Sequence, residues 1–578
     1  MDPILSSKIE HLIDEYKQTF CGINWDWRKG QKEIIIQIIN AYFDNDINNV
    51  VAECPTGSGK SHIAMCVAWV LNNLKCRGYI LASDISLQDQ YEADIDKMNI
   101  KWPSVKGIDR YKCIENDECV SLGKCKILHK RPVKMPCYDQ CPYYRVRDAA
   151  SKSKTAVFNY SYWLLQMNYV RHMSDDPMFT TRDFIICDEA HKITDIVQSH
   201  FAPRINKLVI LDNLKKLKIF LNNHIRTFKF DEKLILIAKI TNKLIIEQDK
   251  EKTFKLLYHF ANELKIIQNI KELIEDFVDE TYNKLKISVP RVIDKACRNC
   301  DYLKDLYCKC VDFVTIISES GLDNLIINNI DKDQLVYNCL EEKYLMRKYF
   351  HDNKKFAVFL SATIGDINQF CNDTGIDKSF YYRMSSNFDF TKSPIYYYGG
   401  RRMSYSNMDD NMPWLIDSIN KILEQYPDER GIIHSASYDL TMKIHEGLSE
   451  KNKDRLIVYK GSEEKQQGID EMYKKGNKVL IGPSLIEGVN LPEDKCRFIV
   501  IAKIPYLSLN DKFVKAKLNK NTNWYKSKAV ISILQGIGRG VRNENDYCDT
   551  FILDANFSDL LKNPNAFPLE FCERIIRK

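Results

Sequence analysis

The sequence lacks a membrane-spanning segment and an export signal. Its 578 residues contain no run of about 18 uncharged apolar residues, the length at which a helix can cross a membrane. The opening MDPILSSKIEHLIDEYK has no apolar core and is typical of an amphipathic helix. We therefore expect no membrane contact and an intracellular, reducing compartment, either cytoplasm or nucleus, of a cell or of a virus-infected cell. There the 19 cysteines are buried, catalytic or metal-bound rather than paired as disulfides.

The sequence also lacks low-complexity linkers, internal repeats and a strong charge imbalance. Its 84 Lys and Arg against 78 Asp and Glu leave a formal net charge of +6. This balance permits nucleic-acid binding, but an ordinary solvated surface explains it equally well. A chain of this length predicts about three to five compact units.

Short apolar runs alternate with helical patterns over residues 28–200. The runs VVAEC (50–54), YILAS (79–83) and FIIC (184–187) are typical of buried strands, so we expect a parallel sheet covered by helices on both faces. Similar runs follow residue 400, which predicts an α/β fold with two lobes. A Cys-, Lys- and Tyr-rich segment and a Leu-, Ile-, Lys- and Asn-rich helical segment interrupt the first lobe. The predicted units are a first lobe in three pieces (1–105, 151–200 and 351–399), a cysteine-rich insert (106–150), a helical insert (201–350) and a second lobe (400–578).

A phosphate-binding loop is predicted where VVAE is followed by CPTGSGKS and the apolar pattern HIAMCVAWVL. A loop between a strand and a helix points its backbone N–H groups at phosphate oxygens. Its glycines allow the unusual torsions, Lys60 reaches the β- and γ-phosphates, and the Ser61 hydroxyl binds magnesium. The predicted ATP contacts are Pro55, Thr56, Gly57, Ser58, Gly59, Lys60 and Ser61.

Two carboxylates follow the strand FIIC directly, in the run DEAH (188–191). In this architecture the carboxyl end of a parallel strand lies beside the phosphate loop. We therefore expect Asp188 to hold magnesium through water, and Glu189 to orient and deprotonate the water that attacks ATP. His191 is expected to relay the state of the nucleotide to the second lobe.

Residues far from the phosphate loop are expected to complete the site. Near the start, Arg28 and Gln31 of RKGQ fit adenine recognition, with a solvated pair as the alternative. Near the end, QGIGRGVR places Arg539 and Arg542 three residues apart on one helix face. Arginines that reach across a cleft stabilise charge on the transferred phosphoryl group. Gln535 is expected to contact the phosphate or the water.

Two more loops are expected at the same cleft. The run SLIEGVNLP (484–492) supplies Glu487, Gly488 and Asn490, which suit a loop that touches both nucleotide and nucleic-acid backbone. The run SAT (361–363) follows the apolar FAVFL, and its hydroxyls can couple the nucleotide state to lobe movement. The sequence therefore predicts ATP and Mg²⁺ as cofactors and a catalytic centre drawn from distant parts of the chain. The candidate catalytic residues are Lys60, Asp188, Glu189, Gln535, Arg539 and Arg542.

Five cysteines fall within 29 residues of the cysteine-rich insert, with the spacing C-x5-C-x5-C-x11-C-x3-C. Four thiolates that lie close in space suit zinc or an iron–sulfur cluster, and the spacing favours neither. Five buried free thiols are the alternative. The candidate ligands are Cys113, Cys125, Cys137 and Cys141, with Cys119 as the alternate.

A second group of cysteines, Cys297, Cys300, Cys308 and Cys310, lies in the helical insert. CRNC is typical of the start of a zinc site. The longer run CRNCDYLKDLYCKC is also typical of a helix whose cysteines fall near core positions. We favour the helix.

Together these runs resemble the XPD/DinG family of superfamily 2 DNA helicases over nearly the whole chain. GIIHSASYDL resembles the bacterial, phage and large-virus branch of that family. The resemblance implies two RecA-like helicase lobes, a 4Fe–4S cluster rather than zinc, and an Arch domain over residues 200–350. The fifth cysteine departs from the family pattern and leaves the choice between Cys119 and Cys125 open. The matching runs, in family order, are RKGQ, PTGSGKS, LQDQ (87–90), CPYY (141–144), FNYSYWL (158–164), DEAH, SAT, EGVNLP and QGIGRGVR.

The resemblance also implies ATP-dependent 5′→3′ movement on single-stranded DNA and unwinding of duplex DNA, with the cluster and Arch units encircling the strand. An ATP-gated nucleic-acid-binding scaffold and an RNA helicase are the alternatives. The intact phosphate loop and acid pair favour a working motor, and the cysteine-rich insert argues against the RNA helicase. Tyr143, Tyr144 and Trp163 are candidate stacking platforms for bases, although core packing is the favoured interpretation for Trp163. The sequence identifies no protein partner.

Overall fold

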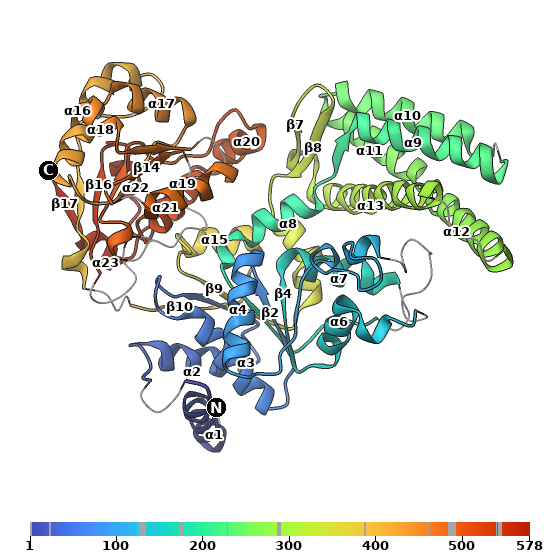
Figure 1. Cartoon of the computed structure of the whole chain (residues 1–578), viewed down its shortest axis with the longest axis horizontal. Helices are drawn as coiled ribbons and strands as arrows, with labels where there is room; N and C mark the ends of the chain where they lie inside the picture. The colour runs from blue at the N-terminus through green and yellow to red at the C-terminus, as the bar shows by residue number, and fades with distance from the viewer. Residues whose placement is uncertain are drawn as a thin grey trace.

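The computed structural model shows two α/β lobes and a helical unit that projects beside them (Figure 1). Within the described part of the chain, no helix is both long and apolar enough to cross a membrane. The described residues are 3–21, 25–123, 125, 135–173, 177–227, 229–285, 291–385, 389–459, 462–474, 476–483, 493–538, 540 and 546–578.

The first lobe contains a seven-stranded parallel sheet. Its strands are β1 (Asn49–Glu53), β2 (Gly78–Ala82), β3 (Ser104–Val105), β4 (Thr155–Asn159), β5 (Phe184–Cys187), β9 (Phe356–Ser361) and β10 (Phe380–Arg383). They lie in the order β10-β1-β9-β5-β2-β4-β3, and every pair is parallel. Every residue of β1, β2, β5 and β9 is buried, because helices cover both faces of the sheet.

Successive strand residues of this sheet enter two different apolar clusters. Val51 and Leu81 belong to one cluster, whereas Val50 and Ile80 belong to the other, as the two-residue period of a strand requires. The first lobe therefore has a core on each side of its sheet. Its helices are α1 (Pro3–Tyr16), α2 (Gln31–Tyr42), α3 (Lys60–Asn73), α4 (Ile85–Lys97), α6 (Pro142–Lys152), α7 (Tyr160–Asn168), α8 (Ile193–Phe201), α14 (Lys343–Tyr349) and α15 (Ile367–Thr374).

The second lobe repeats this plan with a second seven-stranded parallel sheet. Its strands are β11 (Ile395–Tyr397), β12 (Gly431–His434), β13 (Leu456–Val458), β14 (Val479–Gly482), β15 (Phe498–Ile501), β16 (Asp549–Ile552) and β17 (Ile575–Arg577). Their order is β13-β14-β12-β15-β16-β11-β17. β11 lies between β16 and β17, so the chain from Ile395 onward already belongs to the second sheet. The expected α/β class with two parallel-sheet lobes is confirmed.

The helices of the second lobe cover both faces of its sheet. They are α16 (Met408–Gln425), α17 (Tyr438–Gly447), α18 (Glu450–Lys453), α19 (Ser462–Lys474), α20 (Lys512–Lys520), α21 (Thr522–Ile537), α22 (Phe557–Leu560) and α23 (Leu569–Glu573). Figure 1 shows α20 and α21 on the side of this lobe that faces the helical unit and α15. α20 packs against β7 and α21 against α15, so this side of the lobe meets the rest of the molecule.

The helical unit projects from the first lobe between α8 and α14 (Figure 1). In α12, Ile267, Ile270, Ile274 and Val278 are buried at the spacing of one helix face. A small antiparallel sheet in the order β6-β8-β7, which the sequence pattern did not indicate, joins the unit to the lobe. The elements are α9 (Lys207–Phe220), α10 (Asp231–Ile246), α11 (Lys250–Leu264), α12 (Ile266–Leu285), α13 (Arg291–Ser320), β6 (Arg204–Asn206), β7 (Leu325–Asn329) and β8 (Gln334–Cys339).

The cysteine-rich segment has little regular structure where it is described. Short 3-10 turns occupy η2 (Ile108–Arg110), η3 (Val120–Leu122) and η5 (Tyr138–Gln140), and α6 follows them. Pro142 begins α6, where the missing proline N–H costs no helix hydrogen bond.

Candidate nucleotide site between the lobes

The predicted phosphate loop lies between the end of β1 and the start of α3. Gly57 and Gly59 have φ angles of 78° and 76°, in the left-handed region that favours glycine. Gly59 is the N-cap residue of α3. The N–H groups of the first helical turn have no acceptor within the helix, so they are available to a ligand held by the loop. Such a helix start attracts anions, and the geometry is that of a phosphate site.

Gln31 holds this loop in place. Its side-chain amide donates to the Ser58 carbonyl oxygen at 2.6 Å, and its Oε1 accepts from the Arg28 backbone N–H at 2.7 Å. The side chain is buried, and a Cβ added to Gly59 would lie 2.5 Å from Gln31 Nε2. Gln31 therefore contacts the loop backbone in this structure, while the Arg28 side chain is exposed. Adenine recognition by this pair stays a prediction.

The two predicted acids follow β5 directly. Asp188 is buried, and its carboxylate accepts from the Tyr91 hydroxyl at 2.7 Å and from the Glu189 N–H at 2.8 Å. Burial, and then the neighbouring Glu189, raise the pKa of Asp188 above its ordinary value. The Glu189 carboxylate lies 3.5 Å from the Lys60 ammonium. The structure thus brings the acid pair to the phosphate loop, as the sequence predicted.

A polar chain leads from these acids into the second lobe. His191 Nδ1 lies 2.8 Å from Ser361 Oγ and 3.4 Å from Glu189 Oε2. Its Nε2 lies 2.5 Å from Gln535 Nε2, and Gln535 also donates to Thr363 Oγ1 at 3.4 Å. Because Ser361 Oγ donates to the Thr363 carbonyl oxygen, the pattern assigns the imidazole proton to Nδ1 and leaves Nε2 to accept from Gln535. In this structure Gln535 therefore contacts the histidine and the SAT run.

The phosphate loop also meets the second lobe directly. A Cβ added to Gly538, just beyond α21, would lie 3.0 Å from the Thr56 hydroxyl. A cavity between the lobes is lined by Pro55 and Thr56 on one side and by Leu534 and Ile537 on the other. The loop is thus part of an interface between lobes rather than an isolated surface turn.

The sequence analysis missed Glu53, the last residue of β1. This buried carboxylate accepts from Arg383 Nε at 2.6 Å, from the Tyr381 hydroxyl at 2.8 Å and from the Ile364 N–H at 3.2 Å. It fixes the start of the phosphate loop against β10 and the segment after the SAT run. The partners lie more than three hundred residues away in sequence, so no local pattern marks the contact.

Several predicted site residues lie outside the described part of the chain. They are Glu487, Gly488, Asn490, Arg539 and Arg542. Their roles stay predictions.

Four of the five clustered cysteines share one small cavity. It is lined by Cys113, Cys125, Cys137 and Cys141, together with Ile114, Val120, Met135, Tyr138 and Tyr144. The fifth, Cys119, does not line the cavity, and its Sγ lies 2.9 Å from Ser121 Oγ. Among the described residues, no three His, Cys, Asp or Glu side chains are close enough to hold a single metal ion.

The cysteines of α13 are part of a helix core. Cys297, Cys300 and Cys310 are buried in the same apolar cluster as the neighbouring helices, and Cys308 is half-buried. All four cysteines lie on the single helix α13, so the helix interpretation is confirmed.

The aromatic side chains proposed as stacking platforms are buried. Trp163 is fully buried, which confirms core packing for that residue. Tyr143 and Tyr144 are also buried, and the Tyr143 hydroxyl lies 3.2 Å from that of Tyr162. The prediction that they offer faces to DNA bases is wrong for this structure, because both rings pack among the cavity and core residues of the cysteine-rich segment.

Comparisons with known proteins agree with this geometry. A helicase C-terminal domain family matches residues 419–568, and the family described as type III restriction enzyme, res subunit, matches residues 24–221. The ATP-dependent DNA helicase YoaA of Escherichia coli is 21% identical over 432 residues, which cover 71% of this chain and 66% of that protein. The ATP-dependent DNA helicase XPD of Sulfolobus acidocaldarius is 22% identical over 457 residues, which cover 74% of this chain and 73% of that protein.

The fold comparison gives the same result. The structure of S. tokodaii Xpd4 superposes with a TM-score of 0.60 at 15% identity and covers 95% of this chain and 99% of its own. Two parallel sheets, with a phosphate loop and an acid pair of the first lobe beside the second, fit the helicase ATPases among these relatives. The family models and the relatives together support an XPD/DinG-like superfamily 2 helicase.

Proposed function

We propose that this protein is an ATP-driven motor that moves 5′→3′ along single-stranded DNA and unwinds duplex DNA. The observation that carries the proposal is the polar chain from Glu189 through His191 to Gln535. It joins the acid pair of the first lobe to α21 of the second, so a change at the γ-phosphate reaches both lobes. DNA is the substrate class because the relatives named above are DNA helicases.

Each group of the site has a chemical role in hydrolysis. The loop N–H groups and Lys60 bind the phosphates, and Glu189 takes the proton of the attacking water. Asp188 and Ser61 offer the oxygen ligands that Mg²⁺ prefers, and bound Mg²⁺ neutralises charge on the phosphates. In the proposal Arg539 and Arg542 stabilise the transferred phosphoryl group.

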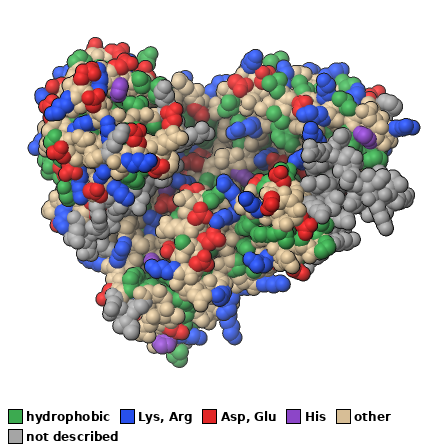
Figure 2. All heavy atoms as spheres, in the orientation of Figure 1, with side chains coloured by type: hydrophobic (Ala, Val, Ile, Leu, Met, Phe, Trp, Pro, Cys, Tyr) green, Lys and Arg blue, Asp and Glu red, His purple; other side chains and the backbone are tan. Residues whose placement is uncertain are grey.

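The helical unit is proposed to be an Arch-like domain that guides the strand. Figure 2 shows the surface hollowed between the second lobe and this unit. Lys and Arg side chains alternate with Asp and Glu around the hollow, so no single-sign field covers this face. A strand held there is gripped by local phosphate contacts, which makes binding weaken steeply with salt.

The cysteine-rich segment is proposed to hold a 4Fe–4S cluster. Four thiols around one cavity are the donor set that such a cluster takes, and each thiolate binds a different iron. This explains why the four cysteines need not be close enough for a single ion. Of the two alternates, Cys125 lines the cavity and Cys119 does not, so we propose Cys113, Cys125, Cys137 and Cys141. Bound, the cluster would cross-link a segment that has little regular structure of its own.

Unwinding assays with three substrates test this function. Duplexes with a 5′ single-stranded tail, a 3′ tail or an RNA tail are compared, with ATP and with Lys60→Ala as the inactive variant. Lys421→Ala, an exposed lysine of α16, is the matched control. We expect unwinding of the 5′-tailed DNA alone, and its loss in Lys60→Ala only.

Other outcomes of this assay are equally informative. Preference for the RNA tail would indicate an RNA helicase. ATP-dependent DNA binding with no unwinding of any duplex would indicate a scaffold.

A further inference from the structure

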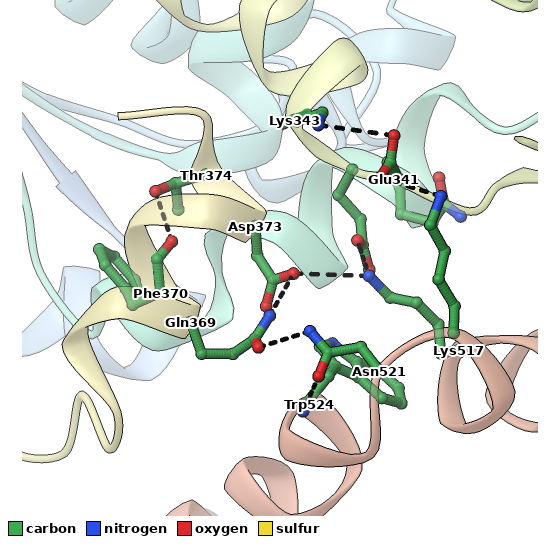
Figure 3. Close-up of polar contacts among 12 residues, drawn as sticks. Glu341, Lys343, Gln369, Phe370, Asp373, Thr374, Lys517, Asn521 and Trp524 are labelled. Carbon is green, nitrogen blue, oxygen red and sulfur yellow. Dashed lines mark hydrogen bonds and ion pairs between the residues drawn. The ribbon is translucent and has the colours of Figure 1, made fainter. Parts of the chain in front are cut away.

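A second contact between the lobes lies away from the nucleotide site, around Lys517 of α20 (Figure 3). The Lys517 side chain is 5% exposed, and its ammonium forms an ion pair with the Glu342 carboxylate. The same ammonium lies 3.5 Å from Asp373 Oδ1. One buried cation therefore faces two acids.

The two acids lie in different segments of the chain. Glu342 caps α14 of the first lobe and follows β8, the strand at the base of the helical unit. Asp373 lies near the end of α15 in the first lobe. Lys517 therefore ties three parts together: the second lobe, the first lobe and the root of the helical unit.

Hydrogen bonds from two side-chain amides continue this contact, as Figure 3 shows. Asn521 Nδ2 donates to Gln369 Oε1 at 2.8 Å, and Gln369 Nε2 donates to Asp373 Oδ1 at 2.9 Å. At the exposed edge, Lys520 pairs with Glu341 at 2.9 Å. We call Lys517, Glu342, Asp373, Gln369 and Asn521 the interlobe latch.

The latch specifies one arrangement of the lobes. Glu342 is 2% exposed, and burial raises the pKa values of Glu342 and Asp373 above their ordinary values. A buried ion pair adds little stability, because desolvation offsets the attraction, but separating its partners leaves buried charge without compensation. Arrangements of the lobes that separate Lys517 from Glu342 and Asp373 are therefore much less favourable in free energy than the arrangement in this structure.

One helix connects the latch to the nucleotide site. Asn521 caps the start of α21, and Gln535 lies near its end, where it contacts His191 and Thr363. The 16 residues of α21 span about 24 Å at 1.5 Å per residue. A rotation of the second lobe that moves Gln535 must also move α20 and Lys517, because α20 and α21 are consecutive and packed together.

We propose that Lys517 is a positioning residue that transmits lobe movement to the helical unit. While Lys517 is seated on Glu342 and Asp373, the root of the helical unit follows the second lobe during ATP turnover. Without that tie, the lobes hydrolyse ATP but the movement of the helical unit is reduced, because only more exposed contacts such as Lys512 Nζ to Asn329 Oδ1 remain. The inference rests on the proposed motor function.

The test compares two lysines of the same helix. Lys517→Met removes the buried cation, whereas Lys520→Met removes the exposed neighbour and is the matched control. We expect the DNA-free ATPase rate of Lys517→Met to stay near that of the parent, while base pairs unwound per ATP fall about tenfold, within the usual range of coupling energies. Lys520→Met should match the parent, and Lys517→Arg should recover part of the loss.

A second measurement follows the movement itself. Hydrogen exchange of β7 and β8 is measured with and without a non-hydrolysable ATP analogue, in the parent and in Lys517→Met, after thermal denaturation has shown that both are folded. We expect the analogue to change exchange clearly in the parent and much less in Lys517→Met. If Lys517→Met keeps the same nucleotide-dependent change, or unwinds with normal ATP economy, the proposal is overturned.

A folding defect of the variant and a failure of the proposed motor function can each be distinguished from a failure of the interlobe latch. If Lys517→Met is unstable, the double variant Lys517→Met/Glu342→Gln removes the more deeply buried of the two unpaired acids, and the exchange experiment is made on it with the same two outcomes. Exchange needs nucleotide binding but no unwinding. A parent that shows the exchange change yet unwinds no duplex would reject the motor function and leave the latch standing.

Discussion

The two lobes contain the same kind of sheet, but their strand ends differ. In the first lobe, β1 leads into the phosphate loop and β5 into the buried Asp188, so both strand ends lie beside that loop. In the second lobe, β12 ends at His434, whose buried imidazole has no hydrogen-bond partner among the described residues. Asp554, just after β16, is also buried and accepts from the N–H groups of Met403, Ile504 and Asn556, each at 3.0 Å.

This comparison shows that one architecture supports two uses of a polar strand end. Asp188 lies beside the phosphate loop, where the proposed chemistry takes place. Asp554 accepts from three backbone N–H groups and stabilises its own lobe. The second lobe contributes to the nucleotide site through a helix, α21, rather than through these strand ends. Substitutions in the two lobes should therefore separate catalysis from stability.

The largest expected effect is at Glu189. Glu189→Gln keeps the shape of the side chain but cannot take a proton, so DNA-stimulated ATP hydrolysis should fall about 10²- to 10⁴-fold. Binding of a fluorescent ATP analogue should remain. Glu424→Gln, an exposed position on α16, is the control and should turn over ATP normally. Near-normal hydrolysis by Glu189→Gln would remove this residue from the site.

The cysteine-rich segment, which only the first lobe carries, provides the second prediction. Anaerobically purified protein should contain about four irons per chain, as a 4Fe–4S cluster requires. Cys125→Ser should lose the iron and the unwinding activity but keep basal ATP hydrolysis, because the phosphate loop lies elsewhere in the lobe. Cys119→Ser is its matched partner and should keep all three. Zinc in place of iron, or the opposite ranking of the two variants, would contradict the assignment.

Asp554 tests whether the strand ends of the second lobe serve stability rather than catalysis. Asp554→Asn places an amide donor where backbone N–H groups already point, and it removes charge-assisted hydrogen bonds. The free energy of unfolding should fall by about 3 kcal/mol, measured by urea denaturation. The ATPase rate of the folded fraction should change little. A large loss of turnover without loss of stability would show that this strand end is functional after all.

The smallest expected effect is a pH dependence at His434. Burial, and then Lys465, lower the pKa of His434 to about 4. Between pH 6.5 and 4 the unfolded chain therefore binds a proton that the folded chain does not, so stability is lost as the pH falls. At pH 5 the loss is about 2 kcal/mol relative to pH 7.5. His434→Leu should show a smaller fall in denaturation midpoint between those two pH values, and an unchanged fall would contradict the account.

The sequence alone determined the features that depend on neighbouring residues. Apolar runs bounded by helical patterns predicted the strands, and β1 followed by glycines, Lys60 and α3 predicted the phosphate loop, because a strand–loop–helix unit closes within a few residues. The DEAH run was placed beside that loop by a rule of parallel sheets, which needs no knowledge of the partners. Helical periodicity also predicted the helical insert, and core packing was the favoured interpretation for Trp163.

Only the tertiary structure decided which distant groups meet. Spacing left Cys119 and Cys125 equivalent, and folding placed Cys125 at the shared cavity and Cys119 outside it. Glu53 meets Arg383, Gln535 meets His191, and Lys517 meets Glu342, although 175 to 344 positions separate the partners in sequence. No local pattern encodes such contacts, since they arise when two lobes bury a common surface and each buried charge or amide must find a partner there. The chain of contacts from the candidate nucleotide site along α21 to the helical unit therefore exists only in the folded protein.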